Sequence, residues 1–317
     1  MNTRPVDRPL RTAVIGVGYL GRFHAQKYGA SPMAELVGVV DADARRGEEV
    51  AAELGCEFFA GIDALPAVDA VSIVVPTQLH YDIAHALLAN GTHVLLEKPM
   101  TTTVAEAQTL IDTARANDTV LQIGHLERFN PAILALDGVL NEPLFIESHR
   151  VAPFNPRGAD VNVVLDLMIH DIDIILDIVG SEVEHMDVSG VPVLSDDIDI
   201  ANARLRFANG CIANVTASRA GMKSERKMRI FQHDAYLSVD FQNRKLGVHR
   251  KGAEVDERGI PQIESEQQSF EAGDALRAEI DAFLDAIING TPPVVSGEDG
   301  MNALKAAIAI TDMLGNR

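Results

Sequence analysis

The hydrophobic positions of the first 124 residues fall into short continuous runs that alternate with amphipathic stretches. Uninterrupted runs of valine, isoleucine and leucine are typical of strands buried on both faces, as in parallel sheets. Each run is followed by a segment with helical periodicity, and this alternation predicts an α/β, doubly wound domain over residues 1–124. The predicted strands are Thr12–Gly16, Glu35–Asp41, Ala70–Val75, Thr92–Glu97 and Thr119–Gly124.

After residue 124 the polar pattern changes to an alternation with a period of two. Two alternating stretches flank Asn209-Gly210, and this dipeptide indicates a β-hairpin because both residues tolerate a positive φ. Other short runs predict more strands, and the chain ends in two predicted helices at residues 274–289 and 297–314. We therefore expect residues 125–317 to form a second domain of the α+β class, built on an antiparallel sheet.

One segment of this second domain combines an apolar pattern with many charges. Residues 165–180 read "LDLMIHDIDIILDIVG", which predicts one long buried helix. Charged side chains are rarely buried without a partner or a function. The polar members of the helix are Asp166, His170, Asp171, Asp173 and Asp177.

The composition excludes several classes of function. The 317 residues carry a formal net charge of −19, so an anionic nucleic acid or membrane surface is not an expected partner. No run approaches the ~18 uninterrupted apolar residues of a membrane span. The two cysteines, Cys56 and Cys211, form neither a disulfide framework nor a metal-ligand spacing, which favours a reducing, cytoplasmic setting.

A glycine-rich pattern follows the first predicted strand. Gly16, Gly18 and Gly21 have the spacing of a dinucleotide loop, in which they permit a tight turn, approach of a pyrophosphate and packing of helix on strand. We expect Tyr19 and Leu20, at the start of the following helix, to lie against the cofactor. Asp41 ends the second strand 20 positions after Gly21, where an acid accepts ribose hydroxyls and favours NAD over NADP. The neighbouring Arg45 and Arg46 leave that preference open.

Two further strand ends carry polar residues. Ligands of open α/β sheets bind outside the carboxyl ends of the strands, so both loops are predicted to face the cofactor. Lys98 stands out, because an X-Pro bond adopts the cis form at modest cost and a cis bond would direct the lysine into the crevice. The predicted cofactor-binding residues of these loops are Pro76, Thr77, His80, Glu97 and Lys98.

Four motifs in this order give the chain a resemblance that covers nearly its whole length. "GVGYLGRFHA", "VVPTQLHYDIA", "LLEKPM" and "LDLMIHDIDI" resemble the Gfo/Idh/MocA family, the glucose–fructose oxidoreductase and inositol dehydrogenase family. The resemblance implies a Rossmann domain, a C-terminal domain with an open, largely antiparallel sheet, and oxidation of a sugar or cyclitol hydroxyl with a nicotinamide cofactor. It also implies that Lys98, Asp166 and His170 are the catalytic residues.

A narrower likeness concerns the substrate. "GHLERFNPA", "FNPRG" and "SERKMRIF" resemble the branch that oxidises the 3-hydroxyl of UDP-N-acetylglucosamine and feeds an aminotransferase making 3-amino sugars, for example for lipid A. Met168 replaces the glycine that the wider family usually has between the two helix residues, a departure shared with that branch. Arginine forks suit a pyrophosphate, so the predicted substrate-binding residues are Lys98, Arg128, Asn130, Asn155, Arg157, His170 and Arg226.

Elementary chemistry agrees with these roles. Oxidation of a secondary alcohol needs a base, and the ordinary histidine pKa of about 6.5 suits His170 to that task. Asp166, four residues earlier on a helix, would lie on the same face and orient the imidazole. Lys98 would stabilise the negative charge that develops on the substrate oxygen. Lysine as the base stays an alternative, since burial lowers its pKa.

Other functions stay open at this point. A zinc dehydrogenase is disfavoured because the sequence offers no third ligand at a recognisable metal-binding spacing to add to an Asp and a His, and we expect no metal. A dehydrogenase of a free sugar or inositol uses the same residues. A non-catalytic NAD-binding regulator need not keep Lys98, Asp166 and His170 together. We also expect a homodimer or homotetramer, formed through the open face of the second sheet.

Overall fold

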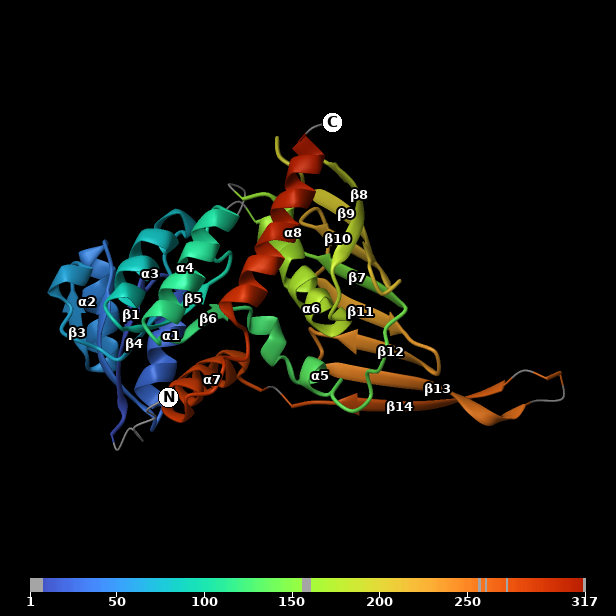
Figure 1. Cartoon of the computed structure of the whole chain (residues 1–317), viewed down its shortest axis with the longest axis horizontal. Coiled ribbons are helices and arrows are strands. Elements are labelled where there is room, and N and C mark those ends of the chain that lie inside the picture. Colours follow the sequence, from blue (N-terminus) through green and yellow to red (C-terminus); the bar gives the residue numbers. More distant parts are fainter. Residues whose placement is uncertain (1–7, 156–160, 256–257, 260, 272, 316–317) are drawn as a thin grey trace. The chain divides into compact units, whose positions relative to one another are not determined.

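The computed structural model (Figure 1) describes residues 8–155, 161–255, 258–259, 261–271 and 273–315. Contacts divide the chain into two compact units. Unit 1 comprises residues 1–126 and 274–304, and unit 2 comprises residues 127–273 and 305–317.

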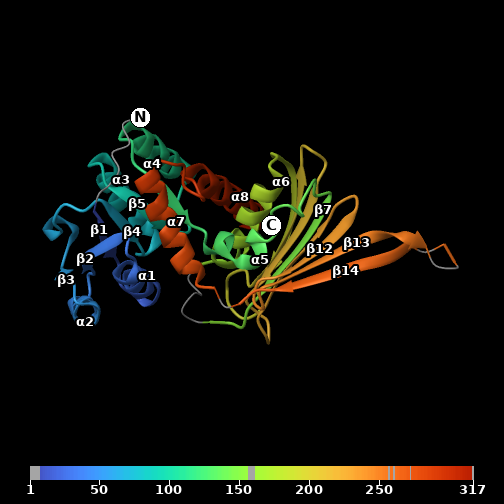
Figure 2. The same ribbon diagram turned by 90° about the horizontal axis from the view of Figure 1, so that it is seen from below.

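Unit 1 contains a six-stranded parallel sheet with strand order β3-β2-β1-β4-β5-β6. This order reverses direction at β1, as in a doubly wound dinucleotide-binding fold, so the predicted fold class is confirmed. Helices cover both faces of the sheet (Figure 2). The strands are β1 (Leu10–Ile15), β2 (Ala34–Val40), β3 (Glu57–Phe59), β4 (Ala70–Ile73), β5 (His93–Glu97) and β6 (Leu121–Gly124). The helices are α1 (Tyr19–Ala30), α2 (Ala44–Leu54), α3 (His80–Ala89), α4 (Val104–Ala116), α7 (Ala275–Asn289) and the first part of α8 (Gly297–Gly315).

The helix starts of unit 1 follow from local sequence. At α4 the hydroxyl of Thr103 accepts from the backbone N–H of Glu106 at 3.2 Å, and the Glu106 carboxylate accepts from the backbone N–H of Thr103 at 3.0 Å. Such a capping box satisfies two of the N–H groups that a helix leaves without partners. At the end of α2, Gly55 adopts a φ of +69°, the left-handed conformation that glycine tolerates best.

Helix α7 packs in the core of unit 1 although it lies near the end of the chain. Its apolar face adds Leu276, Ile280, Phe283 and Leu284 to a buried cluster formed by β1, α1 and β5. Residues 274–304 thus belong to the compact unit of the parallel sheet, and the domain bounds 1–124 and 125–317 stay a prediction. Burial of this apolar face against the parallel sheet is the physical reason, because periodicity predicts a helix but not the surface that covers it.

Unit 2 contains an eight-stranded sheet with strand order β14-β13-β12-β11-β7-β10-β9-β8. Only β7 and β10 pair in parallel among the strands of this sheet, so it is mixed and mostly antiparallel. Its strands are β7 (Phe145–Val151), β8 (Val183–Val191), β9 (Ile200–Phe207), β10 (Ile212–Ser218), β11 (Glu225–Phe231), β12 (Ala235–Asp240), β13 (Lys245–Val255) and β14 (Pro261–Ser269). Its helices are α5 (Pro131–Leu134), α6 (Ile169–Val179) and the end of α8.

The predicted hairpin at Asn209-Gly210 joins β9 to β10. Gly210 has a φ of +89°, and Ile212 pairs with Arg206 across the turn. Side chains of β9 alternate between buried and exposed, and α6 packs against β7 and β10 on the buried face (Figure 2). The alternation of the sequence therefore reflects a sheet covered by helices on one face.

Candidate active site

The glycine loop between β1 and α1 has no room for side chains at two of its three glycines. A Cβ atom on Gly16 would lie 2.5 Å from the carbonyl oxygen of Val74, and Gly16 has a φ of +85°. A Cβ atom on Gly21 would lie 1.8 Å from the carbonyl oxygen of Gly16. These approaches agree with the tight turn predicted at Gly16 and with the packing of helix on strand predicted at Gly21.

Gly18 has a different environment. A Cβ atom at this position would meet no atom within 4 Å, so the backbone faces open space. Gly18 is also the N-cap of α1 and supplies no side-chain cap to the first-turn N–H groups. A helix N-terminus of this kind attracts an anion through its N–H groups and its dipole. The loop therefore fits a pyrophosphate. Leu20 is half-buried, and Tyr19 is exposed with its ring edge against Phe23.

Asp41 directly follows β2 and holds the glycine loop. Its carboxylate accepts from the backbone N–H of Val17 and from the backbone N–H of Asp43, each at 2.8 Å. Arg46 lies 3.7 Å from the same carboxylate. A carboxylate has lone pairs for further donors such as ribose hydroxyls, so Asp41 keeps this capacity while it orients the loop.

The glycine loop supports a first prediction. Replacing Gly21 with alanine should weaken binding of NAD by about 1–3 kcal/mol, because the new methyl group displaces the turn at Gly16. Calorimetric titration with NADH measures the effect. Gly61→Ala is the matched control, since Gly61 has an extended backbone and open space around the added Cβ. Equal affinity of the Gly21 variant and the wild type would contradict the proposed role of the loop.

The loops after β4 and β5 are tied together by His80. Its Nδ1 lies 2.9 Å from the carbonyl oxygen of Pro99, and its Nε2 lies 2.9 Å from the carbonyl oxygen of Val75. The side chain is 1% exposed, and burial lowers the pKa of the imidazole. His80 therefore fixes two loops from inside the protein, whereas the sequence predicts a residue that faces the cofactor. Pro76 is exposed, and the half-buried Thr77 begins the short 3₁₀ turn that precedes α3.

Lys98 follows the last residue of β5. The peptide bond between Lys98 and Pro99 is cis, and the Lys98 side chain is half-buried. The Glu97 carboxylate accepts from the backbone N–H of Lys98 at 3.2 Å. Glu97 itself is 8% exposed, so the carboxylate that orients this backbone belongs to the interior of unit 1.

In unit 2, the segment around Asp166 and His170 is two helices rather than the single predicted one. Val164–Met168 forms a π-helical turn that contains Asp166, and α6 begins at Ile169, with His170 as its second residue. The side chain of Asn162 caps the turn by accepting from the N–H groups of Val164 and Leu165 at 3.0 Å each. Single π-turns occur frequently at functional sites. Both predicted catalytic side chains are half-buried here.

Asp171 on α6 is part of a buried ion pair with the sheet. Its carboxylate lies 2.6 Å from Nε of Arg150 on β7 and accepts from the hydroxyl of Ser148 at 2.8 Å. The two charged side chains are 1% and 3% exposed. Arg150 also donates to Glu127 at 2.8 Å.

Asp173 and Asp177 both pair with Arg128. Nε of Arg128 lies 2.8 Å from Asp173, and Nη1 lies 2.5 Å from Asp177. These two later acids of the apolar helix thus form ion pairs within unit 2, and the side chain of Asp177 is 46% exposed. Arg128 is 7% exposed, so the structure assigns it a buried ion pair where the sequence predicts contact with substrate.

The other predicted substrate residues lie in different environments. Asn130 is the buried N-cap of α5, and its amide donates to the carbonyl oxygen of Phe241 at 3.2 Å. Asn155 is exposed after β7. Arg226 on β11 is 48% exposed and lies 3.4 Å from Glu127. Arg157 lies outside the described residues.

Two buried groups escaped the sequence analysis. Glu279 on α7 converges with His24 and Glu97 inside unit 1. Asp199 in unit 2 is fully buried against Arg219 at 2.8 Å. Burial raises the pKa of Asp199, but hydrogen bonds from Arg219 and nearby backbone N–H groups outweigh it and keep the pKa well below its ordinary value. A signal for Glu279 exists in the sequence, because the residue shares the apolar face of its helix with Phe283.

None of the helices in the described part of the chain has the length and apolar character that crossing a bilayer requires.

Comparisons with known proteins cover both units. A family model described as "Oxidoreductase family, NAD-binding Rossmann fold" matches residues 10–125. A second model, "Oxidoreductase family, C-terminal alpha/beta domain", matches residues 136–313.

Among individual proteins, a UDP-N-acetylglucosamine 3-dehydrogenase of Acidithiobacillus ferrooxidans is 45% identical over 95% of this chain and 96% of its own length. A crystal structure of that dehydrogenase matches with a TM-score of 0.91, covering 96% of this chain and 97% of the other. A scyllo-inositol 2-dehydrogenase (NAD(+)) of Bacillus subtilis is 28% identical over 98% of this chain and 96% of its own length.

Proposed function

The chain belongs to the Gfo/Idh/MocA oxidoreductase family, with an NAD-binding Rossmann domain, and from that membership we propose its substrate. We propose that it oxidises the 3-hydroxyl of UDP-N-acetylglucosamine to the 3-keto sugar with NAD. The observation that carries this proposal is the 45% identity, over nearly the whole of both chains, to a UDP-N-acetylglucosamine 3-dehydrogenase. The inositol dehydrogenase is more distant, at 28% identity over a similar length.

The glycine loop fits the cofactor. Gly18 faces open space at an uncapped helix N-terminus, which suits a pyrophosphate despite the net charge of −19. Asp41 would accept the ribose hydroxyls and repel a 2′-phosphate, which supports NAD as the preferred form. NAD, when bound, supplies the hydride acceptor.

The chain's own residues would handle the proton and the charge. We propose that His170 removes the proton of the substrate hydroxyl while the C–H bond breaks and the carbonyl forms. Asp166 would hold the imidazole in one tautomer and stabilise the imidazolium. Lys98 would donate to the reacting oxygen and stabilise its developing negative charge. Each role rests on the family motif and on the half-buried positions of these side chains.

Exposure separates the predicted substrate residues. We propose Arg226 for the pyrophosphate and Asn155 for a polar group of the nucleotide sugar, because both are exposed. The substrate role of Arg157 stays a prediction. Arg128 and Asn130 would act indirectly, since the first is held by two carboxylates and the second caps α5.

The substrate proposal has a direct test. Purified protein should reduce NAD in the presence of UDP-N-acetylglucosamine, followed as NADH absorbance, and mass spectrometry should detect the 3-keto sugar. If NADH stays bound, 2-oxoglutarate is added as the oxidant that converts NADH back to NAD. Turnover is then followed by the 3-keto sugar and not by NADH absorbance. Free N-acetylglucosamine is the matched control, because it lacks the diphosphate that the arginines would bind. Turnover of myo-inositol or a free hexose, with none of the nucleotide sugar, would reject the proposal.

Two further proposals concern the context of the reaction. A 3-keto sugar is a substrate for transamination, so we expect an aminotransferase making a 3-amino sugar to consume the product.

We also propose a homodimer or homotetramer formed through the open face of the second sheet. There a row of rings crosses β7, β11, β12 and β13, with successive centroids 6.1, 5.0 and 5.1 Å apart. Its members are Phe145, Phe231, Tyr236 and His249.

A further inference from the structure

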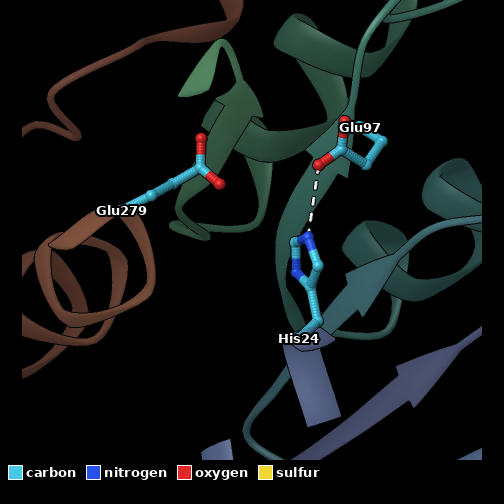
Figure 3. A group of neighbouring side chains, drawn as sticks. All are labelled: His24, Glu97 and Glu279. Atoms are coloured by element: carbon cyan, nitrogen blue, oxygen red, sulfur yellow. Dashed lines mark ion pairs between the residues drawn. The ribbon is translucent and has the colours of Figure 1, made fainter. Parts of the chain in front are cut away.

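Three ionisable side chains from distant parts of the sequence meet inside unit 1. His24 comes from α1, Glu97 from the end of β5 and Glu279 from α7, and their carboxylates and imidazole point toward one another (Figure 3). His24 and Glu279 are fully buried, and Glu97 is 8% exposed. The Glu97 carboxylate accepts from the backbone N–H of Lys98, but none of the glycine-loop or catalytic roles described above uses His24 or Glu279.

The imidazole of His24 is engaged on both sides. Its Nδ1 lies 3.1 Å from the hydroxyl of Ser72, which in turn lies 2.9 Å from the hydroxyl of Tyr28. Its Nε2 faces Oε1 of Glu97 at 3.2 Å, close enough for an ion pair but not aligned as a hydrogen bond. His24 is therefore committed to one of the two carboxylates.

Glu279 has no comparable partner. Neither of its buried carboxylate oxygens makes a hydrogen bond within the described residues, and no arginine or lysine there pairs with Glu279 or Glu97. An ionised carboxylate in such a place costs several kcal/mol, whereas a protonated one carries no charge and offers a donor. Burial, and then the charge of Glu97, raise the pKa of Glu279 well above its ordinary value.

The position of Glu97 matters for the loop that follows it. Its carboxylate accepts from the backbone N–H of Lys98, and a Cβ atom on Gly124 would lie 2.8 Å from Oε1. The carboxylate therefore fits between β6, His24 and the Lys98 turn with little freedom. Any group that fixes this carboxylate also fixes the backbone at Lys98.

We propose that Glu279 is a neutral carboxylic acid beside the carboxylate of Glu97, and that Glu279 and His24 are positioning residues for the turn at Lys98. The proton removes the negative charge that an ionised Glu279 would place in the interior of unit 1 beside Glu97. The inference about the proton stands on the geometry alone. The inference about positioning rests on the proposed function, through the role of Lys98.

A divalent metal is the rival occupant, because one histidine and two glutamates are suitable donors. The surroundings favour the proton. A metal requires a fourth ligand. The neighbouring hydroxyl of Ser72 is already hydrogen-bonded to His24 and to the hydroxyl of Tyr28. Calorimetric titration of chelator-treated protein with Zn²⁺ distinguishes the two. Tight binding of one ion that Glu279→Gln abolishes would overturn the proposal.

Infrared spectroscopy tests the proton directly and needs no turnover. The wild type at neutral pH should show the carbonyl stretch of a protonated carboxylic acid, with a shift in D₂O, and Glu279→Gln should lack it. Glu298→Gln is the matched control, since Glu298 is an acid of the same unit that is 50% exposed and paired with Arg115. Absence of the band from the wild type would overturn the proposal.

Kinetics tests the positioning role. Glu279→Leu removes the carboxylic acid beside Glu97 and should lower kcat at least about tenfold with little change in the KM for NAD, whereas Glu279→Gln keeps a neutral polar group there and should restore most of kcat. Circular dichroism verifies that both variants fold. Equal kcat in the leucine variant and the wild type would overturn positioning. If the wild type turns over no nucleotide sugar, the proposed function fails while the infrared result still decides the proton.

Discussion

Replacement of His170 with alanine is expected to lower kcat/KM for UDP-N-acetylglucosamine by about 100- to 10,000-fold, the range that a general base contributes. The expectation follows from the chemistry of the alcohol, whose proton needs an acceptor near neutral pH. His170 is half-buried at the start of α6, directly after the π-helical turn that holds Asp166. Affinity for NADH, measured by calorimetry, should stay within about threefold, because the glycine loop and Asp41 are unaltered.

The matched control is His185→Ala. His185 belongs to β8 of the same unit and its side chain is 60% exposed, so its removal should leave both kcat and KM unchanged. The wild-type kcat/KM should fall as pH decreases through the pKa of the base, and the alanine variant should lose this acidic limb. If the protein is instead a regulator that binds NAD without turnover, neither the wild type nor the two variants will oxidise the substrate.

Lys98 separates the two possible assignments of the base. If His170 is the base and Lys98 only stabilises charge, Lys98→Met should cost about 100- to 1,000-fold in kcat and keep the acidic limb of the pH profile. If lysine is the base, the methionine variant should lose that limb, and His170→Ala should remain within about tenfold of the wild type. The second pattern would reverse the roles that we propose for these two residues.

The parallel sheet of unit 1 was predictable from the sequence because its signals are local. Continuous apolar runs such as Ala70–Val75 need no knowledge of distant residues, and the glycine spacing reports contacts within one turn. The short strand β3 and the polar edge strand β14 were missed, since three residues show no period and a largely exposed strand shows little alternation. The hydrophobic pattern of a short segment thus predicts a strand or helix only where that segment is buried on at least one face.

In the candidate site, local sequence patterns do not predict which residues become partners. The sequence predicts Arg128 for the substrate because arginine forks suit a pyrophosphate, but two carboxylates of α6 form ion pairs with it. Glu279 was not singled out because its partners, His24 and Glu97, lie in other elements far along the chain. Docking of α7 on the parallel sheet brings these residues together, and no periodicity encodes which surface a helix covers.

Replacement of Arg150 with methionine is expected to destabilise unit 2 by about 3–5 kcal/mol, the cost of leaving a buried charge without its partner. Arg150 lies 2.6 Å from Asp171 and 2.8 Å from Glu127, and its own side chain is 3% exposed. Methionine fills much of the same volume, so the loss comes from the charge and not from a cavity. The chain has no tryptophan, so denaturant unfolding is followed by circular dichroism.

The pH dependence tests this explanation, because charge and packing predict different behaviour. Burial raises the pKa of Glu127, but Arg150 outweighs it and holds the pKa below its ordinary value, so in the wild type this stability is lost as pH falls through the acidic range. In the methionine variant Glu127 loses this cation, and its pKa rises. The deficit should therefore be largest at neutral pH and shrink as pH falls and Glu127 becomes protonated. Arg229→Met on β11 is the control and should change the free energy of unfolding by less than about 0.5 kcal/mol, because the side chains of Arg229 and its partner Glu147 are 44% and 36% exposed.

A double variant separates charge from packing. Asp171→Asn added to Arg150→Met should recover part of the lost stability at neutral pH, since it removes the unpaired charge. A deficit that depends neither on pH nor on this second change would mean that Arg150 acts through packing.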